Sequence, residues 1–211
     1  MQKAPRPCAA PFRWRLVVMA KAPVAGRVKT RLAGEVGTAT AVRFARHSLA
    51  CLLQRITADG RWSTALAVTP DATASSRLWP TGVPLMPQGA GNLGARMQRL
   101  VDRAPLGPVV IIGTDIPHIA RAHIAAAFRL LGRHDAVLGP AADGGYWLVG
   151  LRRRPRTLRP FHGVRWSTPH ALADTLANLR GRSIARLPTL LDIDTAADLA
   201  LCAAVFGRRV R

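Results

Sequence analysis

Short β-branched runs alternate with longer helical patterns along the chain, which is typical of βαβ units and a mainly parallel sheet. A weaker strand is expected at residues 83–86, and clear apolar runs predict strands at 16–19, 65–68, 109–112, 136–138, 146–151 and 184–187. The run 109–112 is continuously apolar, as expected of a central strand that is covered on both faces. The pattern therefore predicts the α/β fold class.

Apolar positions that recur about every 3.6 residues predict the helices that connect these strands. The clearest helical pattern follows Gly37, with Thr38 as the expected N-cap. Thr195, with Asp198 three residues later, forms a short-side-chain variant of a capping box that opens the last helix. Other helices are expected at residues 93–101, 119–131 and 168–179.

No internal repeat and no interdomain linker interrupts this pattern. We therefore expect a disordered tail at residues 1–14, one domain over residues 15–207 and a basic C-terminal end at residues 208–211.

The composition is that of an ordinary folded domain, since 49% of the 211 residues are hydrophobic and 20% are charged. No apolar stretch approaches the ~20 residues that a membrane-spanning helix needs, and residues 1–14 lack the apolar segment of a secretory signal. Cys8, Cys51 and Cys202 are odd in number and widely spaced, which fits neither a disulfide framework nor a zinc site. We expect a cytoplasmic protein without a membrane span.

The net charge of +20 invites a nucleic-acid partner, but the distribution of the charge disfavours one. Arginines recur along the whole chain, and their densest runs lack the aromatic residues that stack on bases. The excess therefore indicates a biased composition. Only three of the 31 basic residues are lysines, and two of these, Lys21 and Lys29, fall within one short segment.

This segment follows the first predicted strand and gathers Lys21, Arg27, Lys29 and Arg31 around Gly26. In a parallel α/β sheet, a loop that leaves the first strand toward a helix is the usual place for phosphates. Gly26 would let the backbone approach an anion closely, and the four cations would counter phosphate charges. The spacing is not that of a P-loop, and a solvated basic loop is the alternative interpretation.

Carboxylates at two places in the sequence are candidate metal ligands. Asp115 follows the strongest strand, where a hard cation that bridges diphosphate oxygens would need a carboxylate; a turn aspartate ahead of a proline is the alternative. Asp192 and Asp194 are expected to point to opposite faces of an extended segment, so that only one would face the metal. We expect Asp194 to do so, and helix capping is the alternative role for the other.

Three further segments could contact substrates. Residues 143–145 place a carboxylate and two glycines beside an aromatic wall, although a simple hairpin turn explains them too. Residues 88–94 form a glycine-rich helix entrance that could read a base edge or could be a flexible loop. Trp166 and Ser167 precede a helix and could form an acceptor pocket, although a tryptophan is often a packed anchor.

Taken together and in order, the segments 21–32, 113–117, 139–146, 166–168 and 192–195 resemble the DUF2064 family. This family is also called the radical-SAM/selenodomain-associated transferase 1 family, and it belongs to the GT-A-like nucleotide-diphospho-sugar transferases. The resemblance spans residues 16–206 and implies a GT-A-like, Rossmann-like single domain with helices on both faces of the sheet. Members are commonly described as glycosyltransferases, and the family looks distantly similar to guanylyltransferases that act on phospholactate or the molybdenum cofactor.

The resemblance also implies roles for individual residues. We expect the catalytic residues to be Asp115, Asp143 and Lys29, and the resemblance implies that Asp115 and Asp194 bind the divalent metal, Mg²⁺ or Mn²⁺. Substrate would contact Asp143, Gly144, Gly145, Trp166 and Ser167. Nucleotide would contact Lys21, Gly26, Arg27, Lys29, Arg31, Gln88, Gly89 and Gly94. The sequence departs from the family pattern at Asn92 and Ala95, where acidic residues are frequent.

These observations lead to a metal-dependent nucleotide-sugar transferase that acts on a small-molecule acceptor as the expected function. The alternative is a nucleotidyltransferase that joins a nucleoside triphosphate to a phosphorylated small molecule and releases pyrophosphate. A second alternative is a nucleotide-binding protein without catalysis, which would keep the basic loop but would not need Asp115. Nothing in the sequence indicates the oligomeric state.

Overall fold

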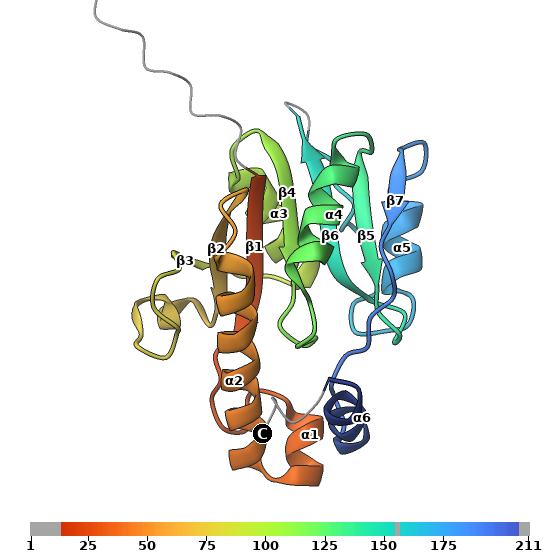
Figure 1. Ribbon diagram of the computed structural model, residues 1–211. Coiled ribbons are helices and arrows are strands. Elements are labelled where there is room, and N and C mark those ends of the chain that lie inside the picture. Colours follow the sequence, from red (N-terminus) through yellow and green to blue (C-terminus); the bar gives the residue numbers. More distant parts are fainter. Residues whose placement is uncertain (1–13, 155–156, 207–211) are drawn as a thin grey trace, which may run out of the picture.

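The protein is built around one seven-stranded sheet with the strand order β3-β2-β1-β4-β6-β5-β7 (Figure 1). The computed structural model describes residues 14–154 and 157–206. The expected N-terminal tail, apart from Trp14 in the first strand, and the basic C-terminal end lie outside these residues. The strands are β1 (Trp14–Lys21), β2 (Trp62–Thr69), β3 (Leu85–Pro87), β4 (Gly107–Ile112), β5 (Ala136–Pro140), β6 (Tyr146–Arg153) and β7 (Ile184–Arg186).

The sheet is mainly parallel, as the alternation of strand and helix patterns predicts. β1 pairs in parallel with β2 and β4, β2 with β3, and β5 with β7. β6 is the exception and runs antiparallel to both β4 and β5. A tight turn joins β5 to β6, and such a short connection allows only an antiparallel pair.

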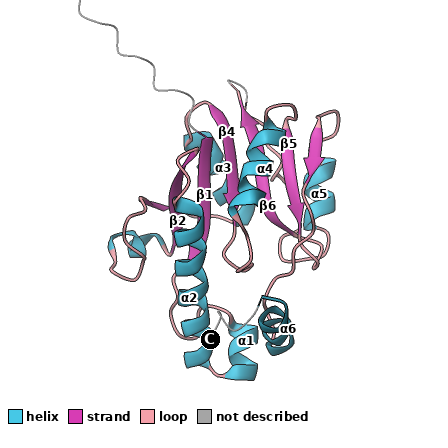
Figure 2. Cartoon of the chain, in the orientation of Figure 1, coloured by secondary structure: helices cyan, strands magenta, loops and turns pink. Residues whose placement is uncertain are grey.

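Helices cover both faces of the sheet (Figure 2). On one face, Val110 and Ile112 of β4 pack with α2 and α4, and on the other face Val109 and Ile111 pack with α3 and α5. This alternation along β4 follows from the two-residue period of a strand. The predicted α/β fold, with a mainly parallel sheet and helices on both faces, is confirmed. The helices are α1 (Thr30–Val36), α2 (Thr38–Thr57), α3 (Leu93–Arg103), α4 (Arg121–Leu131), α5 (Ala171–Ala177) and α6 (Ala196–Phe206), with a 3-10 helix at Asp71–Ser75.

Helices α1 and α6 lie beyond the carboxyl ends of the parallel strands, below the sheet in Figure 1. Leu32 of α1, Phe44 of α2 and Ile193 before α6 form a small apolar cluster there. Glu35, the only glutamate in the chain, accepts a hydrogen bond from the backbone N–H of Ala196 at 2.7 Å. These contacts hold α1 and α6 beside the sheet edge where ligands bind in open α/β folds.

Helix starts show what local patterns can and cannot predict. The Thr195–Asp198 capping box is confirmed, because each residue's side chain accepts a hydrogen bond from the other's backbone N–H. Thr38 is already helical, and Gly37 takes the N-cap position with a φ of 84°. Helix α5 begins later than expected, at Ala171. Within the described residues, no helix is both long and apolar enough to cross a membrane.

Candidate active site

Two adjoining cavities open at the carboxyl ends of the parallel strands. The first has a volume of about 540 Å³ and the second of about 360 Å³. Residues from β1, α3 and three loops line both cavities, namely Met19, Leu93, Asp115, Ser167 and Asp194. The two spaces therefore meet at the carboxylates that the sequence predicts as metal ligands.

Cations surround the first cavity, as the basic segment after the first strand predicts. Lys21 comes from the end of β1, Arg27 from the loop that follows, and Lys29 and Arg31 from the start of α1. Arg96 on α3 adds a fifth cation. A space of this size with five cations suits the phosphates of a nucleotide.

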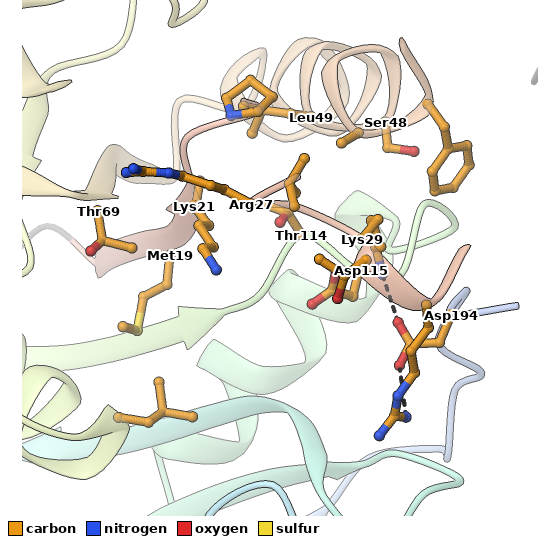
Figure 3. A pocket seen from close by; sticks show the side chains of 18 of the residues that line it. Met19, Lys21, Arg27, Lys29, Ser48, Leu49, Thr69, Thr114, Asp115 and Asp194 are labelled. Atoms are coloured by element: carbon orange, nitrogen blue, oxygen red, sulfur yellow. Dashed lines mark hydrogen bonds and ion pairs between the residues drawn. The ribbon is translucent and has the colours of Figure 1, made fainter. Parts of the chain in front are cut away.

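Lys29 makes the central polar contacts of the site (Figure 3). Its ammonium Nζ lies 2.6 Å from Oδ1 of Asp115 and 3.0 Å from Oδ1 of Asp194, and it donates to the carbonyl oxygen of Ile193 at 2.7 Å. Only 7% of the Lys29 side chain is exposed, whereas 59% and 45% of the two aspartate side chains are. One buried cation thus holds two solvent-facing carboxylates together.

Burial by itself would lower the pKa of Lys29, but the carboxylates of Asp115 and Asp194 outweigh it and raise the pKa above its ordinary value of 10.5. Lys29 therefore stays charged at any physiological pH. Arg31 adds a weaker ion pair, with Nη1 3.9 Å from Oδ2 of Asp194 and 82% of its own side chain exposed. Such an exposed pair contributes little to stability and leaves Arg31 available for an anion.

Backbone contacts explain why Asp115 and Asp194 meet although they lie far apart in the sequence. The carbonyl oxygen of Asp115 accepts a hydrogen bond from the N–H of Ile193 at 3.1 Å. The loop after Asp115 is tied to α2, because Nη1 of Arg55 donates to the carbonyl oxygens of Pro117 and Ile119 at 2.7 and 2.9 Å. Both carboxylates are therefore fixed in place by contacts of their backbone segments.

Gln88 lines the first cavity, but the hydrogen bonds of its side chain are made inside the protein. Its Nε2 donates to the carbonyl oxygens of Ala20 and Ala67, and its Oε1 accepts from Nη1 of Arg96 at 2.8 Å. With 2% of the residue exposed, the amide orients Arg96 toward the wall of the cavity. The sequence singles out Gln88 but misses Arg96. Arg96 could have been found from its place eight residues after Gln88, on the helix that the glycine-rich loop opens.

Four carboxylates line the second cavity, contributed by Asp115, Asp143, Asp192 and Asp194. Burial is the first cause that raises the pKa of Asp192 to about 7, and the charges of Asp143, Asp115 and Asp194 add to it. The expectation that Asp192 and Asp194 face opposite ways is wrong, since both line this cavity. Residues two apart along an extended segment share a face, and the buried Ile193 between them points the other way.

Aromatic side chains form the walls of the second cavity. Tyr146 and Trp147 come from the start of β6, and Trp166 packs edge-on against Tyr146 with ring centroids 6.3 Å apart. Trp166 also rests on Gly94, where an added Cβ would lie 2.8 Å from its ring. Gly94 is therefore a contact point for the wall. Residues 143–145 form the β5–β6 turn and also face the cavity through Asp143 and Gly145.

The structure brings together most of the predicted site residues. Around the first cavity it gathers Lys21, Arg27, Lys29, Arg31, Gln88, Asp115, Ser167 and Asp194, and around the second Asp115, Asp143, Gly145, Trp166, Ser167 and Asp194. The glycines Gly26, Gly89, Gly94 and Gly144 shape the adjoining segments and do not line either cavity. Besides Arg96, sequence reasoning missed Ser48 of α2, whose buried hydroxyl lines the first cavity without a hydrogen-bond partner.

The donor set at the junction fits a divalent cation. Asp115 and Asp194 already converge on a single positive charge, the Lys29 ammonium, and both remain partly exposed. In the described ranges no three His, Cys, Asp or Glu side chains gather into a group that could hold a metal ion. Two carboxylates nevertheless suit Mg²⁺, because proteins usually bind it through one or two carboxylates together with substrate phosphates.

Comparison with known proteins identifies the family. A family model described as an uncharacterized protein conserved in bacteria, DUF2064, matches residues 52–168, more than half of the chain. The chain belongs to the DUF2064 family. The matched region includes Gln88, Arg96, Asp115, Asp143 and Trp166, whereas the basic loop and the Asp192–Asp194 segment lie outside it. No curated protein matches the chain.

Solved structures share the fold of this DUF2064 protein. A candidate nucleotide-diphospho-sugar transferase from Desulfovibrio desulfuricans G20 is 28% identical, covers 93% of this chain and 88% of its own, and gives a TM-score of 0.82. CMP:2-keto-3-deoxy-manno-octonic acid synthetase complexed with CTP is 14% identical, with 92% and 98% covered and a TM-score of 0.55. The 2-C-methyl-D-erythritol 4-phosphate cytidylyltransferase of Thermus thermophilus is 18% identical, with the same coverage and TM-score. The last two show the fold alone, and the set supports a transferase, the class expected from the sequence.

Proposed function

We propose that this DUF2064 protein is a metal-dependent nucleotide-sugar transferase that acts on a small-molecule acceptor. The observation that carries the proposal is the pair of adjoining cavities: a basic one that suits a nucleotide diphosphate and an aromatic, acidic one beside it, with Asp115 and Asp194 at the junction. A transferase needs this arrangement, because the bond that breaks must lie between the leaving phosphate and the acceptor.

In this proposal the protein stabilises the leaving group. An acceptor oxygen attacks the anomeric carbon of the sugar, the bond from that carbon to the phosphate oxygen breaks, and the nucleoside diphosphate leaves with the extra charge. Lys21, Arg27, Arg31 and Arg96 line the space where that charge develops. A divalent cation bound by Asp115 and Asp194 would supply further charge neutralisation at the phosphates.

The second cavity holds the acceptor in the same proposal. Asp143 faces this cavity, and its Oδ1 is fixed by the backbone N–H of Gly145 at 2.8 Å. We assign Asp143 to accept the proton that the acceptor hydroxyl loses. Trp166 and Ser167, which line the same cavity, would also contact the acceptor.

The number of cations favours a second candidate, a nucleotidyltransferase. Five basic side chains would also hold a triphosphate whose pyrophosphate leaves. The cytidylyltransferase of Thermus thermophilus has the same fold, which supports this candidate at the level of the fold only.

Identification of the products tests both candidates. The protein is incubated with Mg²⁺ or Mn²⁺ and either labelled nucleotide sugars or labelled nucleoside triphosphates, in each case with a panel of hydroxyl-bearing and phosphorylated small molecules. We expect hydrolysis or transfer from a nucleotide sugar that is lost in Asp115→Asn. Acceptor-dependent release of pyrophosphate would instead support the nucleotidyltransferase. Nucleotide binding without turnover of any donor would favour a binding protein.

A further inference from the structure

The two cavities have opposite charge, although the chain as a whole carries a net charge of +20. Lys21, Arg27, Lys29, Arg31 and Arg96 line the first cavity. Among the described residues that line the second cavity there is no lysine, arginine or histidine, and Asp115, Asp143, Asp192 and Asp194 supply four carboxylates. The excess of arginine in the sequence makes a cavity wall without a basic residue a specific feature of this site.

Lys29 is the cation closest to these carboxylates, and it balances only part of their charge. Its ammonium pairs with Asp115 and Asp194, the two carboxylates that both cavities share. Within the part of the chain that the structure describes, neither Asp143 nor Asp192 forms an ion pair with a basic side chain. Asp143 therefore leaves a negative charge in the far part of the second cavity even when Asp115 and Asp194 are neutralised, and Asp192 adds to this charge once it has released its proton, above about pH 7.

The remaining walls are apolar or carry small polar groups. Met97, Ile111 and Val149 line the cavity together with the rings of Tyr146 and Trp166. Carboxylates accept hydrogen bonds from N–H and O–H donors, and aromatic faces favour flat apolar surfaces or cations. A phosphate group would offer this cavity neither donors nor a positive charge.

We propose that the second cavity selects an acceptor that is uncharged or cationic and carries hydroxyl or amino groups, and that it excludes phosphate esters and other anions. This inference rests on the proposed function, because it assigns the second cavity to the acceptor. It separates the two candidate reactions: an acceptor of this class suits transfer of a sugar to a hydroxyl or amine, whereas the nucleotidyltransferase would need a phosphorylated acceptor.

Collisional quenching of tryptophan fluorescence measures the charge of the cavity directly. Trp166 lines the second cavity and is partly exposed, as is Trp14 at the start of β1, outside both cavities, whereas Trp62, Trp79 and Trp147 are buried. Quenching by caesium and by iodide is measured at constant ionic strength, each normalised to free N-acetyl-tryptophanamide, and the signal lost in Trp166→Phe gives the contribution of this residue. We expect caesium to quench Trp166 at least twofold more efficiently than iodide, against the net charge of the protein.

Charge-removing variants connect this preference with the carboxylates. Asp143→Asn/Asp192→Asn should abolish the preference for caesium, whereas Asp102→Asn on the exposed surface of α3, which removes the same kind of charge elsewhere, should leave it unchanged. A normalised iodide quenching equal to or greater than that of caesium in the wild-type protein would overturn the proposal. A preference that persists in the double variant would overturn it as well.

Binding to matched sugars then tests the acceptor class itself. With the first cavity saturated by uridine diphosphate and Mg²⁺, glucosamine and glucose 6-phosphate are titrated while tryptophan fluorescence is followed. We expect glucosamine to bind at least tenfold more tightly, and tighter binding of glucose 6-phosphate would refute the inference. Calorimetry with nucleoside diphosphates, without a sugar, separates failure of the proposed function from failure of this inference. If no nucleoside diphosphate binds, the proposed function is refuted, whereas the charge preference of the second cavity is still decided by the quenching experiment.

Discussion

The half-buried carboxyl group of Asp192 provides the most quantitative test of the electrostatics of the site. Its pKa is raised from 3.8 to about 7, first by burial and then by Asp143, Asp115 and Asp194. Such a change corresponds to about 4 kcal/mol, at about 1.4 kcal/mol for each tenfold change in proton affinity. Solvent reaches part of the side chain, so we expect about half of this, near 2 kcal/mol.

The sign follows from proton binding in the two states. Between pH 3.8 and about 7 the folded protein holds a proton on Asp192 that the unfolded chain has released, so the contribution of this group to stability is full below pH 3.8 and is lost as the pH rises toward 7. Asp192→Asn keeps the shape and never carries the charge. The variant should therefore be about 2 kcal/mol more stable than the wild type at pH 8 and equally stable near pH 4.

Thermal unfolding followed by circular dichroism checks this prediction, in buffers from pH 4 to pH 8 that contain EDTA so that no metal screens the carboxylates. A difference of 2 kcal/mol in a domain of this size corresponds to a rise in Tm of about 4 to 8 °C. Asp102→Asn, which removes an exposed carboxylate, should leave Tm unchanged. A variant that is no more stable than the wild type at pH 8, or an advantage that does not shrink toward pH 4, would refute the reasoning.

Lys29→Ala should weaken nucleotide binding by about 1.5 to 3 kcal/mol, the scale of one charge-assisted interaction, because loss of the ammonium leaves the charges of Asp115 and Asp194 unbalanced beside the phosphates. Calorimetry measures the difference, and unchanged affinity would contradict the assignment of the first cavity to phosphates. Asp115→Asn should keep the wild-type circular dichroism but lose the stabilisation that nucleotide gains from Mg²⁺, because an amide lacks the charge that a hard cation needs; undiminished stabilisation would argue against this ligand. Gly94→Ala should lower the free energy of unfolding by about 2 kcal/mol, since its Cβ would lie 2.8 Å from the Trp166 ring, whereas Gly34→Ala, with open space around it, should be neutral or slightly stabilising in the same denaturant titration.

Local sequence patterns were sufficient for most elements of the fold. The apolar run at 109–112 predicts β4 as a central strand, and the structure places β4 in the middle of the sheet with side chains packed on both faces. The Thr195–Asp198 pair marks the start of α6 correctly. Helix α1 has only a weak local signal, because its seven residues, with Gly34 among them, carry little apolar periodicity, and packing on α2 and α6 decides its conformation.

The sequence by itself determined which residues are available for chemistry, since the rare lysines, the aspartates after strands and the glycine-rich loops can be read along the chain. Only the tertiary structure decided how they combine. The ion pair between Lys29 and Asp194 joins residues 165 positions apart, and no local pattern encodes a contact between segments that meet only when the sheet forms. For the same reason, the separation of a basic cavity from an acidic one was hidden behind a uniform excess of arginine. Charge along a chain adds up to a net value, whereas charge in a folded site depends on which side chains the sheet edge brings together.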